Sequence, residues 1–68
     1  MARTNAEFIE AFAAELRHRP DRAPTMRRLA RRLGARETDL GTGATTLRRQ
    51  MLEVAGFRLV DGRYVKVD

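Results

Sequence analysis

The sequence predicts a small, mostly α-helical protein of three helices that ends in a C-terminal β-hairpin. Apolar residues recur at intervals of three and four in three segments, which proline- or glycine-containing stretches separate. Near the C-terminus, two runs of β-prone residues flank Asp61-Gly62, a dipeptide typical of two-residue hairpin turns. The 68 residues form one domain, 1–68, with a single core. We expect such a core to provide a stability of roughly 3–5 kcal/mol.

The charge of the chain is strongly basic. It contains 14 basic and nine acidic residues, a formal net charge of +5, and all basic residues except Lys66 are arginine. This balance in a small domain favours a polyanionic partner. A GC-rich genome also enriches arginine, and in that alternative the charge is solvated and has no partner.

The composition excludes several classes of protein. There is no cysteine, so neither a disulfide nor a cysteine-ligated zinc is expected. No apolar run approaches the roughly 18 residues of a membrane span, and the first residues lack the apolar core of a signal peptide. We therefore expect a soluble, cytoplasmic protein. Serine and cysteine nucleophiles are absent and His18 is the single histidine, so we expect no enzyme activity, metal or cofactor.

The first helix is predicted over residues 5–18. Thr4 and Glu7 have the spacing of a capping box, which marks a helix start. The apolar stripe that should face the core comprises Phe8, Ile9, Phe12, Ala13 and Leu16. Because this helix carries several acidic residues, we expect it to form the back wall of the core and not to face a phosphate backbone.

The second helix is predicted over residues 25–34, after a connector in which Pro20 and Pro24 interrupt helical structure. Thr25 is the expected N-cap. The apolar face comprises Met26, Leu29, Ala30 and Leu33. The opposite face carries four arginines with no acid among them, namely Arg27, Arg28, Arg31 and Arg32. Such a face suits either contacts with phosphates or plain exposure to solvent.

The third helix is predicted over residues 43–55, with Gly56 as its stop. Residues 37–39 suit an extra helical turn before it, and Leu40 suits the core. Gly41-Thr42-Gly43 reads as a cap, in which Thr42 either only caps the helix or also binds a phosphate. The predicted core face comprises Leu47, Met51, Val54 and Ala55. Leu52 falls on the outward side, where it either packs under a neighbouring element or contacts a partner.

The hairpin is predicted over residues 57–67. A two-residue turn at Asp61-Gly62 pairs Val60 with Arg63 and Leu59 with Tyr64. Both faces of this hairpin carry apolar residues, so the sequence leaves open which face meets the core.

The string TTLRRQMLEVAGF followed by a DG hairpin resembles the third helix and wing of winged helix-turn-helix DNA-binding domains. The long segment 35–41 departs from the tightest form of this motif. The resemblance implies that the third helix enters the major groove and that the wing contacts the backbone or minor groove. Carried over by position, the DNA contacts are Thr45, Thr46, Arg48, Arg49 and Glu53 on the third helix, Arg58 and Arg63 in the wing, and Arg27, Arg28 and Arg31 on the second helix.

The expected function is therefore non-enzymatic binding of double-stranded DNA, in regulation of transcription or as an accessory to replication or recombination. Such a protein would be associated with the nucleoid and could derive from a phage or plasmid. One alternative is a protein-interaction module that uses the same basic surface, with a separate partner or with other domains of a larger parent protein. RNA binding is a weaker alternative, because the chain has only four aromatic residues for stacking on bases. The target sequence and the oligomeric state stay open.

Overall fold

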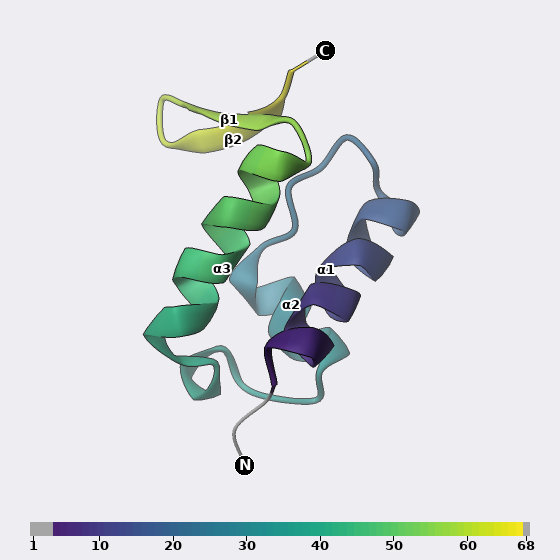
Figure 1. The fold of residues 1–68 in the computed structure, drawn as a ribbon, viewed down its shortest axis with the longest axis vertical. Coiled ribbons are helices and arrows are strands. Elements are labelled where there is room, and N and C mark those ends of the chain that lie inside the picture. Colours follow the sequence, from purple (N-terminus) through teal and green to yellow (C-terminus); the bar gives the residue numbers. More distant parts are fainter. Residues whose placement is uncertain (1–3, 68) are drawn as a thin grey trace.

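The computed structural model describes residues 4–67 and shows three α-helices followed by an antiparallel β-hairpin, as predicted. The elements are α1 (Asn5–His18), α2 (Met26–Arg32), the 3-10 helix η1 (Glu37–Asp39), α3 (Gly41–Val54), β1 (Phe57–Val60) and β2 (Arg63–Lys66). Helices α1 and α3 lie next to each other with α2 behind them, and the hairpin caps the C-terminal end of α3 (Figure 1). Within residues 4–67, every helix is too short or too polar to span a membrane.

Local sequence signals place the starts of α1 and α2. Thr4 and Glu7 form the predicted capping box, in which the Thr4 hydroxyl accepts from the Glu7 N–H and the Glu7 carboxylate accepts from the Thr4 N–H. Thr25 caps α2 by accepting from the Arg28 N–H at 3.1 Å. Helix α2 ends at Arg32, slightly before the predicted end, and the predicted extra turn appears as η1. The Arg36 backbone N–H and guanidinium stabilise this turn by binding Asp39, and they lower the pKa of that carboxyl.

Helix α3 begins two residues earlier than predicted, at Gly41. Leu40 after η1 has right-handed helical geometry, and Gly41 follows it with a φ of 80°, a left-handed conformation that glycine adopts readily. The chain turns into α3 at Gly41, and helical hydrogen bonding begins there instead of at Gly43. Thr42 therefore lies inside the first turn, and the prediction that it caps the helix is wrong. No side chain of the described residues caps this end of α3.

The core lies where the three helices and the hairpin meet. Its buried apolar residues are Phe8, Ala11, Phe12, Leu29, Ala30, Leu52 and Phe57. Of the other residues predicted for the core, several are half-buried and pack against this cluster, namely Leu16, Leu33, Leu40, Leu47 and Met51.

The predicted core face of α3 is wrong at Val54, and Leu52 follows the first of its two predicted alternatives, packing under neighbouring elements. Leu52 is fully buried, with 0% of its surface exposed, whereas Val54 is 90% exposed. The apolar residues of α3 extend around more of the helix than the core covers. The side of α3 that carries Ala44, Leu52 and Ala55 packs against the core cluster. Val54 lies at the other edge of these apolar residues and stays in solvent.

Helix α1 is also rotated relative to the prediction, because it buries a carboxylate. Glu15 is buried, and its Oε2 accepts from the Arg32 Nε of α2 at 2.6 Å. Its Oε1 lies 3.7 Å from Nη1 of Arg28. This ion-pair cluster draws the Glu15 side of α1 towards α2, and it leaves Ile9, which was predicted to be buried, 44% exposed.

The hairpin has the predicted register, with Val60 paired to Arg63 and Leu59 to Tyr64. Asp61 and Gly62 both have positive φ, as a type I′ turn requires. The face that carries Phe57 and Tyr64 meets the core, which answers the question left open by the sequence. The Lys66 ammonium donates to the Ala55 carbonyl at the end of α3 and so ties β2 to that helix.

Candidate nucleic-acid interface

One side of α3 presents a continuous stripe of polar side chains. Thr42, Thr46, Arg49 and Glu53 follow one another at intervals of four, three and four residues, and all are exposed. This spacing places them on one side of the helix over about 16 Å. Thr45 is exposed beside them. The stripe contains most of the residues that the sequence predicted to read DNA bases.

Arg48 is not part of this stripe, although the sequence placed it there. It is half-buried on the core side of α3, and its Nε donates to the Pro24 carbonyl at 2.7 Å. Its guanidinium carbon lies 5.4 Å from the centre of the Tyr64 ring, within the range of a cation–π contact. Burial lowers the pKa of this guanidinium. Arg48 therefore joins α3 to the α1–α2 connector and to the hairpin.

Around Arg48, the connector and the tip of the hairpin enclose a hollow of about 430 Å³. Three arginines line this arginine hollow, namely Arg22 from the connector, Arg48 from α3 and Arg63 from β2. The hydroxyl-bearing residues Thr25 and Tyr64 also line it. The hollow therefore concentrates donors for an anion in one place.

The arginines of this hollow have no counter-ion among the residues that the structure describes. Asp21 also lines the hollow, but no carboxylate of the described residues forms an ion pair with Arg22, Arg48 or Arg63. The oxygen of Thr25 already accepts from the Arg28 N–H, so its own O–H remains able to donate. A half-buried cation without a carboxylate partner favours an external anion, since its charge is otherwise compensated only by dipoles and water.

The arginines of α2 divide into two pairs. Arg28 and Arg32 bind Glu15 of α1, an acid from another helix, which neither of the two uses predicted for this face, phosphate contacts or plain exposure to solvent, included. Arg27 and Arg31 are exposed, and neither has a carboxylate partner in residues 4–67. Of the α2 residues predicted to bind phosphate, Arg27 and Arg31 are therefore the ones free to do so.

In the hairpin, Arg58 and Arg63 are both exposed. They face Val65 and Val60 across the ladder, on the side turned away from the core. Arg63 beside the turn also lines the arginine hollow, whereas Arg58 does not. The sequence did not single out Arg22, because only the folded structure brings the connector next to the hairpin tip.

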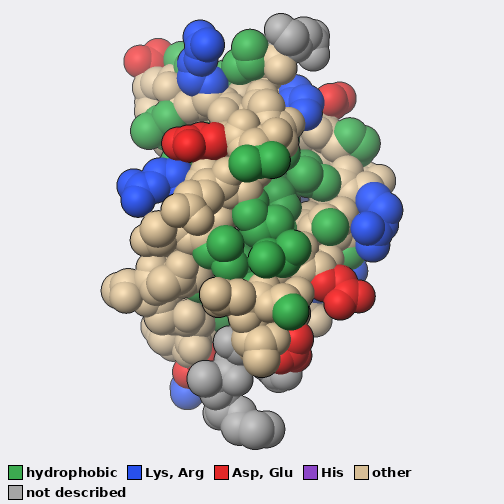
Figure 2. All heavy atoms as spheres, viewed as in Figure 1, with side chains coloured by type: hydrophobic (Ala, Val, Ile, Leu, Met, Phe, Trp, Pro, Cys, Tyr) green, Lys and Arg blue, Asp and Glu red, His purple; other side chains and the backbone are tan. Residues whose placement is uncertain are grey.

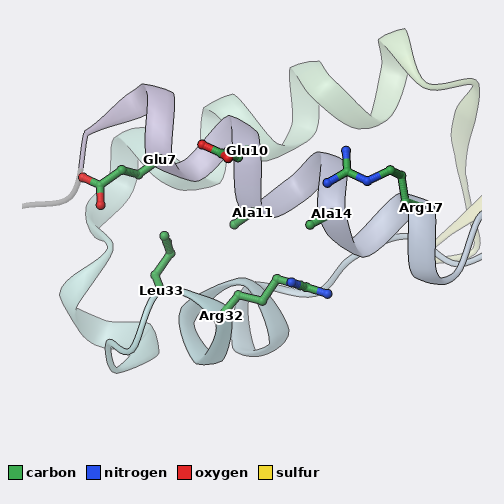
Figure 3. A pocket seen from close by; sticks show the side chains of 7 residues that line it. All are labelled: Glu7, Glu10, Ala11, Ala14, Arg17, Arg32 and Leu33. Carbon is green, nitrogen blue, oxygen red and sulfur yellow. The ribbon is translucent and has the colours of Figure 1, made fainter.

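A different groove, between α1 and α2, has mixed charge. It measures about 300 Å³, with Glu7 and Glu10 towards one end and Arg17 and Arg32 towards the other (Figure 3). Arg32 is already bound to Glu15. The two carboxylates make this groove unsuited to a polyanion. That α1 does not face a phosphate backbone stays a prediction.

Replacing Arg48 with alanine is expected to destabilise the fold by about 1–3 kcal/mol. The change leaves the buried Pro24 carbonyl without its donor and removes the contact with the Tyr64 ring. Urea denaturation followed by circular dichroism measures the loss. Arg49→Ala is the matched control, because Arg49 is exposed one residue away, and its effect should stay within about 0.5 kcal/mol. Equal effects of the two changes would contradict a structural role for Arg48.

No group of histidine, cysteine or acidic side chains within residues 4–67 has the arrangement of a metal site. Comparison of the chain with protein-family models, with curated proteins and with solved structures finds no match.

Proposed function

We propose that this protein binds double-stranded DNA without catalysis, with the polar stripe of α3 in the major groove. In this arrangement the arginine hollow and the outer arginines of the hairpin hold backbone phosphates. The fold that this proposal implies is a winged helix-turn-helix, with the hairpin as the wing. The observation that carries the proposal is the hollow, in which a half-buried Arg48 shares the lining with Arg22 and Arg63 and no carboxylate within residues 4–67 pairs with any of the three.

The two parts of the surface suit the two kinds of contact that DNA offers. Arginine binds phosphate through paired N–H donors, and phosphate contacts set the position of a protein on the duplex. Arg49 of the stripe can donate two bonds to guanine, and Glu53 can accept from cytosine. Thr46 lies on the same stripe between Thr42 and Arg49, and it can contact either a phosphate or a thymine methyl group. Specificity therefore depends on α3, and affinity depends mainly on the arginines around it.

The alternatives named from the sequence receive less support. Single-stranded RNA is usually bound through exposed aromatic rings, whereas Phe8, Phe12 and Phe57 are buried and Tyr64 is half-buried under Arg48. A protein partner on the basic surface would need acidic groups that match the same arginines. Competition of duplex RNA and single strands against duplex DNA of the same sequence separates these partners.

The binding of random duplex DNA is expected to weaken steeply as salt rises. With about five phosphate contacts, the logarithm of the association constant should fall against the logarithm of the salt concentration with a slope of about −4 to −5. Fluorescence anisotropy of a labelled duplex, titrated at several salt concentrations, measures this slope.

The matched control is Arg17→Ala, which removes an exposed arginine from the mixed-charge groove of α1 and should leave the slope unchanged. A flat response to salt, or no binding of duplex DNA at low salt, would contradict the proposal.

A further inference from the structure

An apolar groove runs between α1 and α3, outside the proposed DNA interface. It measures about 430 Å³, and its main lining residues are Ile9, Ala13, Leu16, Leu47, Met51 and Val54. Figure 2 shows the corresponding hydrophobic side chains gathered in the middle of the face that α1 and α3 form in Figure 1. None of the arginines of the hollow lines this groove.

The exposure of this groove costs the isolated chain free energy. Val54 is 90% exposed and Ile9 is 44% exposed, although both are large aliphatic residues. They do not stand singly, because Leu16, Leu47 and Met51 continue the apolar surface between them. A contiguous apolar patch of this kind on a chain with 34% charged residues marks an interaction surface.

The charges on the side of α1 that leads from the apolar groove to the α1–α2 groove suit a second copy of the same chain. Glu10 and Arg17 are both exposed, and both lie on α1 (Figure 3). They are seven residues apart, which places them two helical turns, or about 10 Å, from each other on one side of the helix. If a second α1 runs antiparallel to the first about a twofold axis beside Ala13 and Ala14, each Glu10 meets Arg17 of the second copy. The surface is therefore complementary to itself, as a twofold interface requires.

We propose that two copies of this chain associate through the α1–α3 groove, with their α1 helices antiparallel. Ala13 in the groove and Ala14 beside it present only methyl groups at the axis, so the two helices can approach closely there. The Ile9 and Leu16 side chains of each copy then enter the groove of the other, where they cover Leu47 and Val54.

The size of this surface predicts a weak dimer. Helices α1 and α3 have 14 residues each, so each is about 21 Å long. Two such helices form a face of about 20 by 20 Å, or about 800 Å² summed over both copies, which is below the range of stable specific interfaces and within that of weak, transient ones. We therefore expect a dissociation constant in the micromolar range, so that both monomer and dimer occur at ordinary laboratory concentrations.

Sedimentation velocity over protein concentrations from about 1 to 200 µM tests this proposal. The unmodified chain should shift from monomer to dimer, and Val54→Glu should weaken association at least tenfold because it buries a charge in the interface. Val60→Glu is the matched control, since Val60 is a valine of the hairpin that is also exposed, at 44% of its surface, and does not line the groove. It should leave association unchanged.

A charge exchange tests the antiparallel arrangement itself. Glu10→Arg and Arg17→Glu alone should each weaken association about tenfold, because each brings like charges together. The double variant Glu10→Arg/Arg17→Glu should return to within about threefold of the original affinity, which only pairing with a second copy of the variant can produce. A chain that stays monomeric throughout, a dimer insensitive to Val54→Glu, or a double variant no better than the single ones would overturn the proposal.

Discussion

Replacing Leu52 with alanine is expected to unfold most of the protein. Leu52 is fully buried in the same core cluster as Phe8, Phe12 and Leu29, which come from α1 and α2. Removing its branched end leaves a cavity that the surrounding helices can fill only in part, at a cost of about 2–5 kcal/mol. A single-core domain of this size has a stability of roughly 3–5 kcal/mol, so little or none remains. Urea denaturation monitored by helical circular dichroism measures the loss.

Val54→Ala provides the matched control for this experiment. Val54 lies two residues after Leu52 on the same helix, is also aliphatic, and is 90% exposed. Its replacement should change the free energy of unfolding by no more than about 0.5 kcal/mol at concentrations where the chain is monomeric. If Val54→Ala destabilised the protein as much as Leu52→Ala, the orientation of α3 described above would be incorrect.

The ends of most elements could be predicted because local chemistry determines them. The capping box at Thr4, the N-cap at Thr25 and the turn at Asp61-Gly62 each depend on residues within a few positions of one another. The hairpin register follows from the turn alone, and the structure has the predicted pairs. The start of α3 was predicted too late, since it depends on η1 as well as on the glycines that the sequence shows.

The rotation of the helices about their axes was harder to predict. An apolar stripe shows that a helix has a buried side, but both α1 and α3 have more apolar residues than one neighbour can cover. The choice between Leu52 and Val54 depends on where α2 and the hairpin close over α3. In α1, the burial of Glu15 depends on arginines 13 and 17 positions away, and no periodicity in α1 reveals them.

The same limit applies to the candidate interface. The stripe from Thr46 through Arg49 to Glu53 could be predicted, because these residues follow helical spacing within one element. Thr42 was expected to cap the helix, and it joins the stripe only because α3 begins at Gly41. The arginine hollow could not, because Arg22, Arg48 and Arg63 come from three segments that only the tertiary fold brings together. Arg48 was assigned to the outer side of α3 as a charged residue, whereas its Nε binds the Pro24 carbonyl. Every residue has a backbone carbonyl, so the sequence does not show that the carbonyl of Pro24 will bind a distant arginine.

The side chains of the stripe and of the hollow are expected to affect DNA binding in different ways. Arg49→Ala should weaken binding to a preferred site, selected from a random pool, by about 1–3 kcal/mol, or roughly fivefold to 150-fold. It should weaken binding to random duplex much less, since base contacts provide specificity. Arg63→Ala should weaken both duplexes by a similar factor and reduce the salt slope by about one, because a phosphate contact is independent of sequence.

Competition binding of the two variants, on the selected and the random duplex at several salt concentrations, separates the two roles. Arg27→Ala extends the test to α2, where an exposed arginine without a carboxylate partner in the described residues should behave like Arg63. Arg28→Ala should change the salt slope less, because the charge of Arg28 is already partly neutralised by its ion pair with Glu15. If Arg49→Ala weakened binding to both duplexes equally, α3 would contribute affinity without reading bases. The proposed position of its stripe in the major groove would then be wrong, even if the protein still bound DNA through the arginine hollow.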